Sequence, residues 1–339
     1  MLRVAVLSGG QSPEREPSLA SGVAVCEGLE AAGHLPISID VGRDGVWRRD
    51  GEIVVLAPGR GLEGADVVFP MLHGPFGEDG TVQGLLECLD MPYVGAGVLA
   101  SALCLDKLMF KELMARAGVP QSSYRPVRIG EFSSDPAGVL ADLTPLGFPM
   151  FVKPARLGSS FGVTRVESIE ELPAALDSAF AYDSLTIVEA AAGGLEIECS
   201  VIGNAHPFAS QPGELVVMSS KSGWRDRETK FTRGSIRLIV PARVSEDVRE
   251  RIRELAVNTF VRTRCRGLAR VDFFVDGETI LINEINTMPG LKATSIFSLM
   301  LSAGGLAYPE MLDRLVQLAL ERAPADGESG LDARVEYFA

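Results

Sequence analysis

The sequence predicts a mixed α/β and α+β protein of three packed units, the first of them a doubly wound α/β domain. The chain has 339 residues, which is too long for one ordinary hydrophobic core. It opens with an apolar run at 2–7, a Gly-rich turn at 8–10 and a helical pattern over 18–32. That order of strand, turn and helix is the opening unit of an α/β domain.

The first unit is expected to extend over residues 1–103. Further short apolar runs predict strands, and the segments between them suit helices or turns. Strands that alternate with helices in this way predict a small doubly wound domain. The runs are 36–39, 53–56, 67–72 and 93–94.

The second unit, 104–190, is predicted to be α+β, and the third is predicted over 191–339. In the second unit a helix over 106–117 stops at Gly118 and Pro120. Its other helices are expected at 136–142 and 168–180, and its strands at 124–127, 150–153, 164–166 and 185–189. The third unit is expected to contain helices at 245–262 and 307–322, and strands at 195–202, 214–218, 235–240, 268–275 and 279–286.

Composition restricts the partners. The net charge of -13 argues against nucleic acid and against an anionic membrane surface. There is no signal-peptide pattern and no apolar run long enough to span a bilayer. The five cysteines form no CxxC pair, which fits a reducing cytoplasm. We therefore expect a cytoplasmic protein, and the net charge leaves room for an anionic small substrate, because a local basic cleft can override the net field.

The strongest local signal is a pair of polar positions on each of two successive strands. Alternate residues of a strand share a face, so Arg270 and Asp272 point one way, and Glu284 and Asn286 share a face on the next strand. Two carboxylates and an amide oxygen suit Mg²⁺ ions that bridge nucleotide phosphates. The alternative is an ordinary hairpin with one polar face.

The register of this hairpin provides a test. A two-residue turn at 276–277 would pair Val275 with Glu278 and place Asp272 and Glu284 on opposite faces. The metal hypothesis therefore predicts a connection of odd length or a β-bulge, either of which brings the two carboxylates together.

A second signal lies at 151–163, where a strand delivers Lys153 to a loop of small residues. Such loops expose backbone N–H groups that can close over phosphates, and Lys153 can hold a phosphate as a point charge. Glu189 ends another strand beside the loop 190–194, where an adenine or ribose would fit. The alternatives are a plain turn for the loop and a surface carboxylate for Glu189.

Three further segments are weaker signals. The glycine turn at 9–10 permits close approach of a ligand, and Glu14 beside it could receive an ammonium group. His73 follows an apolar strand at the end where open α/β sheets bind ligands. The N–H of Gly290, with Arg270, could stabilise an oxyanion, and Ser295 could bind a carboxylate. A structural turn, a hydrogen-bonded core histidine and an ordinary loop remain the respective alternatives.

Taken together, these segments resemble the D-alanine–D-alanine ligase family over nearly the whole chain. Several motifs in one order are far more specific than any single motif. The segments that carry the resemblance are 7–16, 72–80, 153–163, 265–272 and 283–290.

The resemblance implies the ATP-grasp fold, with ATP between the second and third units. It implies two Mg²⁺ ions, or Mn²⁺ in their place, on Asp272, Glu284 and Asn286, and phosphate contacts from Lys107 and Lys153. Glu189 and Glu196 would contact the ribose or the adenine edge.

It also implies that Glu14, within reach of His73 and Ser159, binds the ammonium group of a first D-alanine, and that Ser295 holds the carboxylate of a second. The reaction would join the two D-amino acids through an acyl phosphate for peptidoglycan precursor synthesis. The family further implies a homodimer.

The chain departs from the family in the polar segment 219–235, which we expect to act as a lid. The resemblance implies that Lys230 and Phe231 bind substrate. Lys230 is retained, but Phe231 replaces the usual tyrosine, and Lys292 and Thr294 depart from the usual acceptor loop. The Phe231 change resembles the D-alanine–D-lactate branch, so a ligase for D-lactate or another D-amino acid, in antibiotic resistance or biosynthesis, is the main alternative. A non-catalytic nucleotide-binding protein and a biotin-dependent carboxylase are further alternatives.

Overall fold

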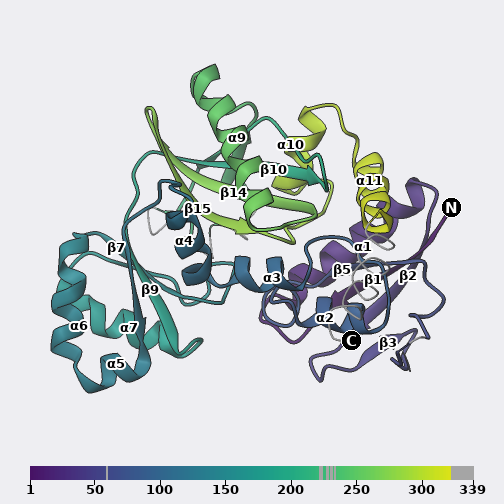
Figure 1. Cartoon of the computed structure of the whole chain (residues 1–339), viewed down its shortest axis with the longest axis horizontal. Coiled ribbons are helices and arrows are strands. Elements are labelled where there is room, and N and C mark those ends of the chain that lie inside the picture. Colours follow the sequence, from purple (N-terminus) through teal and green to yellow (C-terminus); the bar gives the residue numbers. More distant parts are fainter. Residues whose placement is uncertain (59, 221–223, 227–228, 230–231, 233, 322–339) are drawn as a thin grey trace, which may run out of the picture.

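In the computed structural model, the described residues are 1–58, 60–220, 224–226, 229, 232 and 234–321. They form three β-sheets with helices around them (Figure 1). Each sheet is built from strands that are close in the sequence, and the order of the strands matches the predicted sequence of units.

The first sheet is built around its first strand. Strand β1 is parallel to β2 on one side and to β5 on the other, in the order β4-β3-β2-β1-β5. All but the first residue of β1 are buried, as expected for a central parallel strand that is covered on both faces. The elements are β1 (Arg3–Gly9), α1 (Arg15–Ala31), β2 (Leu35–Val41), β3 (Trp47–Arg49), β4 (Glu52–Ile53), β5 (Val67–Met71), α2 (Thr81–Cys88) and α3 (Val98–Leu105).

The second sheet is antiparallel, in the order β6-β9-β7-β8. Helices α6 and α7 contribute Val139, Leu143, Leu172 and Leu176 to the buried core on one face of this sheet. The elements are α4 (Lys107–Arg116), β6 (Tyr124–Arg128), α5 (Ile129–Ser134), α6 (Pro136–Leu143), β7 (Met150–Pro154), β8 (Thr164–Val166), α7 (Leu172–Phe180) and β9 (Leu185–Ala190).

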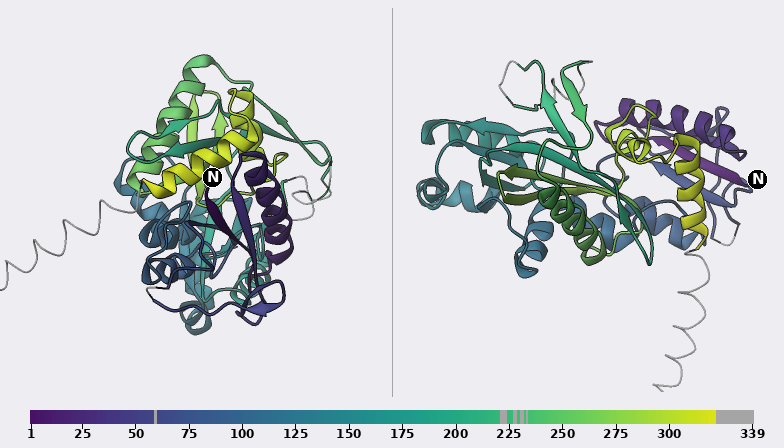
Figure 2. Two further views of the ribbon diagram at one scale, coloured as in Figure 1. Left: turned by 90° about the vertical axis from the view of Figure 1, so that its right-hand side faces the viewer. Right: turned by 90° about the horizontal axis from the view of Figure 1, so that it is seen from above.

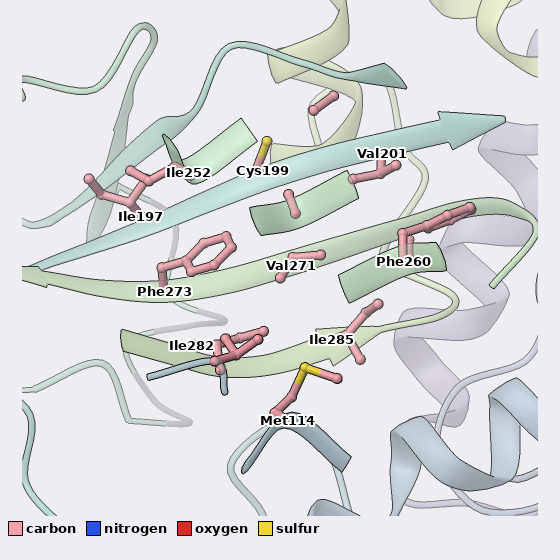
Figure 3. Close-up of a cluster of buried hydrophobic side chains, with 14 of the residues drawn as sticks. Met114, Ile197, Cys199, Val201, Ile252, Phe260, Val271, Phe273, Ile282 and Ile285 are labelled. Carbon is pink, nitrogen blue, oxygen red and sulfur yellow. The ribbon is translucent and has the colours of Figure 1, made fainter. Parts of the chain in front are cut away.

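The third sheet is antiparallel, in the order β13-β12-β10-β14-β15, with β11 beside β10. Figure 3 shows its main core, in which Ile252 and Phe260 of α9 pack against Cys199 and Val271 of the two central strands. The elements are β10 (Leu195–Gly203), β11 (Phe208–Ala209), β12 (Gly213–Val217), β13 (Ile236–Ile239), α9 (Glu246–Arg262), β14 (Gly267–Asp276), β15 (Thr279–Asn286), α10 (Ile296–Ala303) and α11 (Tyr308–Leu320).

The β14–β15 hairpin contains the bulge that the metal hypothesis requires. Asp276 pairs with Thr279, so the turn lies at 277–278, and the register then shifts between Asp272 and Phe273. Asp272 consequently faces Glu284 directly. The prediction that a bulge brings these two carboxylates together is confirmed.

The last two helices pack on the first sheet. Figures 1 and 2 show α11 beside α1, and side chains of α10 and α11 share one buried cluster with Val6, Val25 and Phe69. The contact between α1 and α11 is close: a Cβ added to Gly28 would lie 2.4 Å from Leu312 Cδ1. The predicted boundaries after 103 and 190 separate the strands of the three sheets, but they remain a prediction as limits of folding units.

Several elements were not predicted, among them β3, β11, α3, α5 and α10. The apolar run 53–56 gives only the two-residue strand β4, and the run 93–94 gives only a bridge between Val68 and Tyr93. The tail beyond residue 321 lies outside the described residues. Within the described part of the chain, no helix is both long and apolar enough to cross a membrane.

Candidate active site

A cavity of about 500 Å³ lies between the second and third sheets. One wall comes from β7, β9 and the loop after β7, and the other comes from β10, β14 and β15. Polar groups that converge on a large cavity mark it as the default binding site. Seven of the predicted site residues line it, namely Lys107, Lys153, Ser159, Glu189, Glu196, Asp272 and Glu284.

Glu189 is buried in the cavity wall between two lysines. Only 3% of the residue is exposed, and its Oε2 accepts a hydrogen bond of 2.9 Å from Lys153 Nζ. Its Oε1 lies 3.3 Å from Nζ of Lys111, which is also buried. Burial would raise the pKa of Glu189, but the two ammonium groups outweigh it and hold that pKa below its usual value. The alternative of a surface carboxylate is therefore wrong.

The start of helix α4 holds the loop that follows β7. Asp106 caps the helix by accepting hydrogen bonds from Leu108 N at 3.0 Å and Met109 N at 3.1 Å. Lys107 Nζ donates to the carbonyl of Leu157 at 2.7 Å. In the same loop, 159–160 are two successive residues with positive φ, 50° and 58°. This unusual backbone is the kind that turns consecutive N–H groups toward a bound anion.

The hairpin carries a chain of alternating charges. Arg270 donates to both oxygens of Asp272 at 2.7 Å, and its Nε lies 2.8 Å from Glu198 Oε2. Arg225 Nη1 donates to the other oxygen of Glu198 at 2.8 Å, and Asn286 Nδ2 donates to Asp272 at 3.2 Å. Burial raises the pKa of Asp272 to about 7 despite the neighbouring guanidinium group.

The oxygen atoms of Asp272, Glu284 and Asn286 fit a hard divalent cation in their chemistry. Among the described residues, no group of three His, Cys, Asp or Glu side chains gathers as a metal site. A cation here would be held by two carboxylates and an amide, with further ligands supplied by water and nucleotide phosphates, as Mg²⁺ sites for nucleotides often are.

A second polar cluster, around Glu14, joins the first sheet to the loop that follows β7. Glu14 is 6% exposed, and its Oε1 accepts a hydrogen bond from Ser159 Oγ, while its Oε2 has no hydrogen-bond partner among the described residues. Gly74 faces that free oxygen, since a Cβ on it would lie 2.6 Å away. His73 is buried beside Glu14, and burial lowers the pKa of its imidazole. The structure thus brings together three residues predicted to bind the first substrate.

The loop after β15 meets the segment that follows β5. The backbone of Met288 lies beside both His73 and Glu78. Farther along this loop, Ser295 Oγ accepts a hydrogen bond of 3.0 Å from Lys292 N. A Cβ on Gly290 would lie 3.3 Å from the same Oγ. Gly290 and Ser295 therefore lie together, but neither lines the large cavity.

The comparisons with known proteins agree with this geometry. The family models "D-ala D-ala ligase C-terminus" and "D-ala D-ala ligase N-terminus" match residues 113–317 and 52–96. A D-alanine–D-alanine ligase of Deinococcus radiodurans is 42% identical over 94% of this chain and 98% of its own length. The chain belongs to the D-alanine–D-alanine ligase family.

Other members of the D-alanine–D-alanine ligase family are also similar. A relative with that name from Mycobacterium ulcerans is 41% identical over 95% of this chain and 96% of its own length. The solved D-alanine–D-alanine ligase of Coxiella burnetii has a TM-score of 0.88 and 32% identity, covering 100% of this chain and 99% of its own. The VanG D-Ala:D-Ser ligase of Enterococcus faecalis has a TM-score of 0.83 and 34% identity, covering 94% and 99%. The predicted ATP-grasp fold is confirmed by these ligase structures.

Four residues in or beside the candidate site were not predicted from the sequence. Lys111 follows Lys107 by four residues, a spacing that places both on one helix face. Glu198 follows Glu196 by two residues on β10 and pairs with Asp272. The other two, Glu78 and Arg225, carry no comparable spacing signal. Lys230 and Phe231, both predicted to bind substrate, lie outside the described residues.

Proposed function

We propose that the protein is an ATP-dependent ligase that joins two D-alanine molecules through an acyl-phosphate intermediate, in peptidoglycan precursor synthesis. The observation that carries this proposal is that the large cavity and the buried Glu14 cluster are adjacent. A cavity with lysines and a carboxylate pair adjoins, through Ser159, a buried glutamate, and one oxygen of this glutamate has no hydrogen-bond partner in the described part of the chain. The names of the similar relatives support D-alanine as the substrate.

In this proposal ATP occupies the large cavity. Lys107 and Lys153 hold phosphates as point charges, and the backbone at 159–160 donates N–H groups to phosphate oxygens. Glu189 and Glu196 face the adenine edge and the ribose. Both carboxylates line the cavity as acceptors for the donor groups of the nucleoside.

We assign the metal ligands to Asp272, Glu284 and Asn286, with two Mg²⁺ ions, or Mn²⁺ in their place. When bound, these ions offset the negative charge of the phosphates during phosphoryl transfer. If Asp272 binds a cation, its contact with Arg270 weakens. The Arg270 guanidinium group still has a buried acceptor, because it also contacts Glu198.

Glu14 accepts the ammonium group of the first D-alanine on its free oxygen, with His73 and Ser159 beside it. A carboxylate oxygen of this substrate attacks the γ-phosphorus, and the bond to the β-phosphate oxygen breaks to release ADP. Arg270 and the N–H of Gly290 stabilise the charge that develops on the acyl oxygen in the following step.

In that step the amine of the second D-alanine attacks the acyl carbon. Its ammonium group loses two protons as the amide forms, and inorganic phosphate leaves. We assign the carboxylate of this second substrate to Ser295 and further substrate contacts to Lys230 and Phe231. The segment 219–235 that contains them is assigned to closing the site against water. The names of the relatives do not favour the D-lactate alternative that Phe231 suggested. We also propose a homodimer and a cytoplasmic location.

Product analysis tests this proposal. The purified protein is incubated with ATP, Mg²⁺ and D-alanine, alone and with D-lactate or D-serine, and phosphate release is measured together with product mass. D-alanyl-D-alanine as the main product is expected in every mixture. A depsipeptide as the main product would refute the choice of acceptor, and no release with any D-amino acid would refute the substrate class.

A further inference from the structure

Lys111 is a buried charge to which the proposed reaction gives no role. It lies on α4 four residues after Lys107, so both side chains leave the same face of the helix. Only 1% of Lys111 is exposed. Lysine is rarely buried so completely, because its ammonium group loses its hydration. Burial lowers the pKa of Lys111, and the nearby carboxylate of Glu189 opposes that shift.

The compensating group is the carboxylate of Glu189. Lys111 Nζ lies 3.3 Å from Oε1, while Lys153 Nζ lies 2.9 Å from Oε2. Each oxygen therefore has its own cation, which fixes both the position and the plane of the carboxylate. Lys111 Nζ also lies 5.3 Å from the centre of the Tyr124 ring. The backbone carbonyl of Lys111 accepts a 2.8 Å hydrogen bond from Gln121 Nε2, which fixes this turn of the helix.

The two lysines differ in their access to the cavity. Lys153 and Glu189 line it, whereas Lys111 does not. When Lys153 turns to a phosphate, it must give up part of its contact with Glu189. A buried carboxylate left without a cation would be strongly unfavourable, so a second, permanent cation is needed. Lys111 is in the position to be that cation.

We infer that Lys111 is a positioning residue for nucleotide binding, which keeps Glu189 ionised and in place while Lys153 exchanges this carboxylate for a phosphate. The inference rests on the proposed function, because it takes the cavity as the ATP site. The lowered pKa of Glu189, which burial alone would raise, agrees with a carboxylate that stays charged.

Lys111→Met tests the inference in the full-length protein, with two separate measurements. Binding of ATP and Mg²⁺ is measured by calorimetry without D-alanine, and steady-state kinetics follow. One buried partner is left unsatisfied, so we expect the Kd and the KM for ATP to rise by about tenfold to a hundredfold. The KM for D-alanine should change less than about twofold, since no contact of Glu14 is altered.

Arg243→Met is the matched control. Arg243 compensates Glu214, another carboxylate that is 1% exposed, at 2.5 Å, and neither residue lines the cavity. This control should keep the Kd for ATP of the wild type. Lys111→Arg, which retains the charge, should recover most of the affinity that Lys111→Met loses.

If Lys111→Met does not fold, the double variant Lys111→Met/Glu189→Gln is measured instead. It also removes the negative charge of Glu189 that Lys111→Met leaves without its partner. Its Kd for ATP should equal that of Glu189→Gln alone, because Lys111 acts through this carboxylate. An unchanged Kd in Lys111→Met, or an additional loss in the double variant, would overturn the inference. Wild-type protein that binds no ATP would instead refute the proposed function.

Discussion

Glu14 offers the sharpest test of the substrate assignment. Glu14→Gln keeps the size of the side chain and an oxygen that can accept from Ser159 Oγ, which now donates to Oε1. The variant removes only the negative charge that would bind an ammonium group. The substitution therefore separates the charge from the packing of this buried position.

The expected magnitude follows from the second oxygen. Glu14 Oε2 is buried, and no residue that the structure describes donates a hydrogen bond to it, so the incoming ammonium group would make a charge-assisted hydrogen bond there. Hydrogen bonds to charged groups contribute about 1.5–3 kcal/mol, which corresponds to about a tenfold to 150-fold loss of affinity. The KM for the first D-alanine should rise by that factor, while the KM for ATP stays within about twofold.

The assay is ADP release at saturating ATP over a wide range of D-alanine concentrations, which resolves the two substrate sites. Glu16→Gln is the matched control, because it makes the same change two residues later, at an exposed carboxylate in the first turn of α1. The assignment would be refuted by Glu14→Gln with both D-alanine constants unchanged, or by a rise in the KM for ATP alone.

Three further predictions concern the metal, the pH dependence and the packing. Asp272→Asn should weaken activation by Mg²⁺ at least about tenfold, measured by titrating the ion at fixed ATP, because a charged ligand is lost; an unchanged titration would exclude this carboxylate as a ligand. Burial raises the pKa of Glu78 from 4.5 to about 8, so the folded state holds a proton that the unfolded chain releases, and stability declines as pH rises through that range. Thermal melts of Glu78→Gln should lack this part of the decline, and parallel curves for variant and wild type would contradict it. Gly28→Ala should destabilise the protein by about 1–3 kcal/mol, because its Cβ meets Leu312 at 2.4 Å, whereas Gly84→Ala, whose nearest contact is 4.0 Å, should be neutral or stabilising in chemical denaturation.

Much of the fold could be predicted from local sequence, and the strands that carry the site were predicted best. The periodicity of β14 and β15 placed Asp272 and Glu284 on strands, and the chemistry of the pair required the bulge that the register shows. Short elements such as β3 and α5 were missed because three to six residues give too few repeats of either period.

The site was harder to predict where residues meet only in three dimensions. Lys153 and Glu189 were each predicted to be in the site, but a surface position for Glu189 remained an alternative. The two residues are 36 apart in the sequence, and nothing in their order shows that their side chains meet at 2.9 Å. Lys111 was missed for the same reason. A lysine on a polar helix is ordinarily solvated, and only tertiary packing buries this one.

The packing of α10 and α11 on the first sheet has a consequence for synthesis on the ribosome. Leu29 and Phe69 emerge early, yet they share their buried cluster with Phe297 and Leu315, which are made more than two hundred residues later. Until then, α1 is the only one of these helices that covers this face of the nascent first sheet, and the part that α10 and α11 will cover is open to chaperones or to neighbouring chains. We expect the second sheet, whose core is drawn from residues 127–188, to reach its final structure first, although it is translated later.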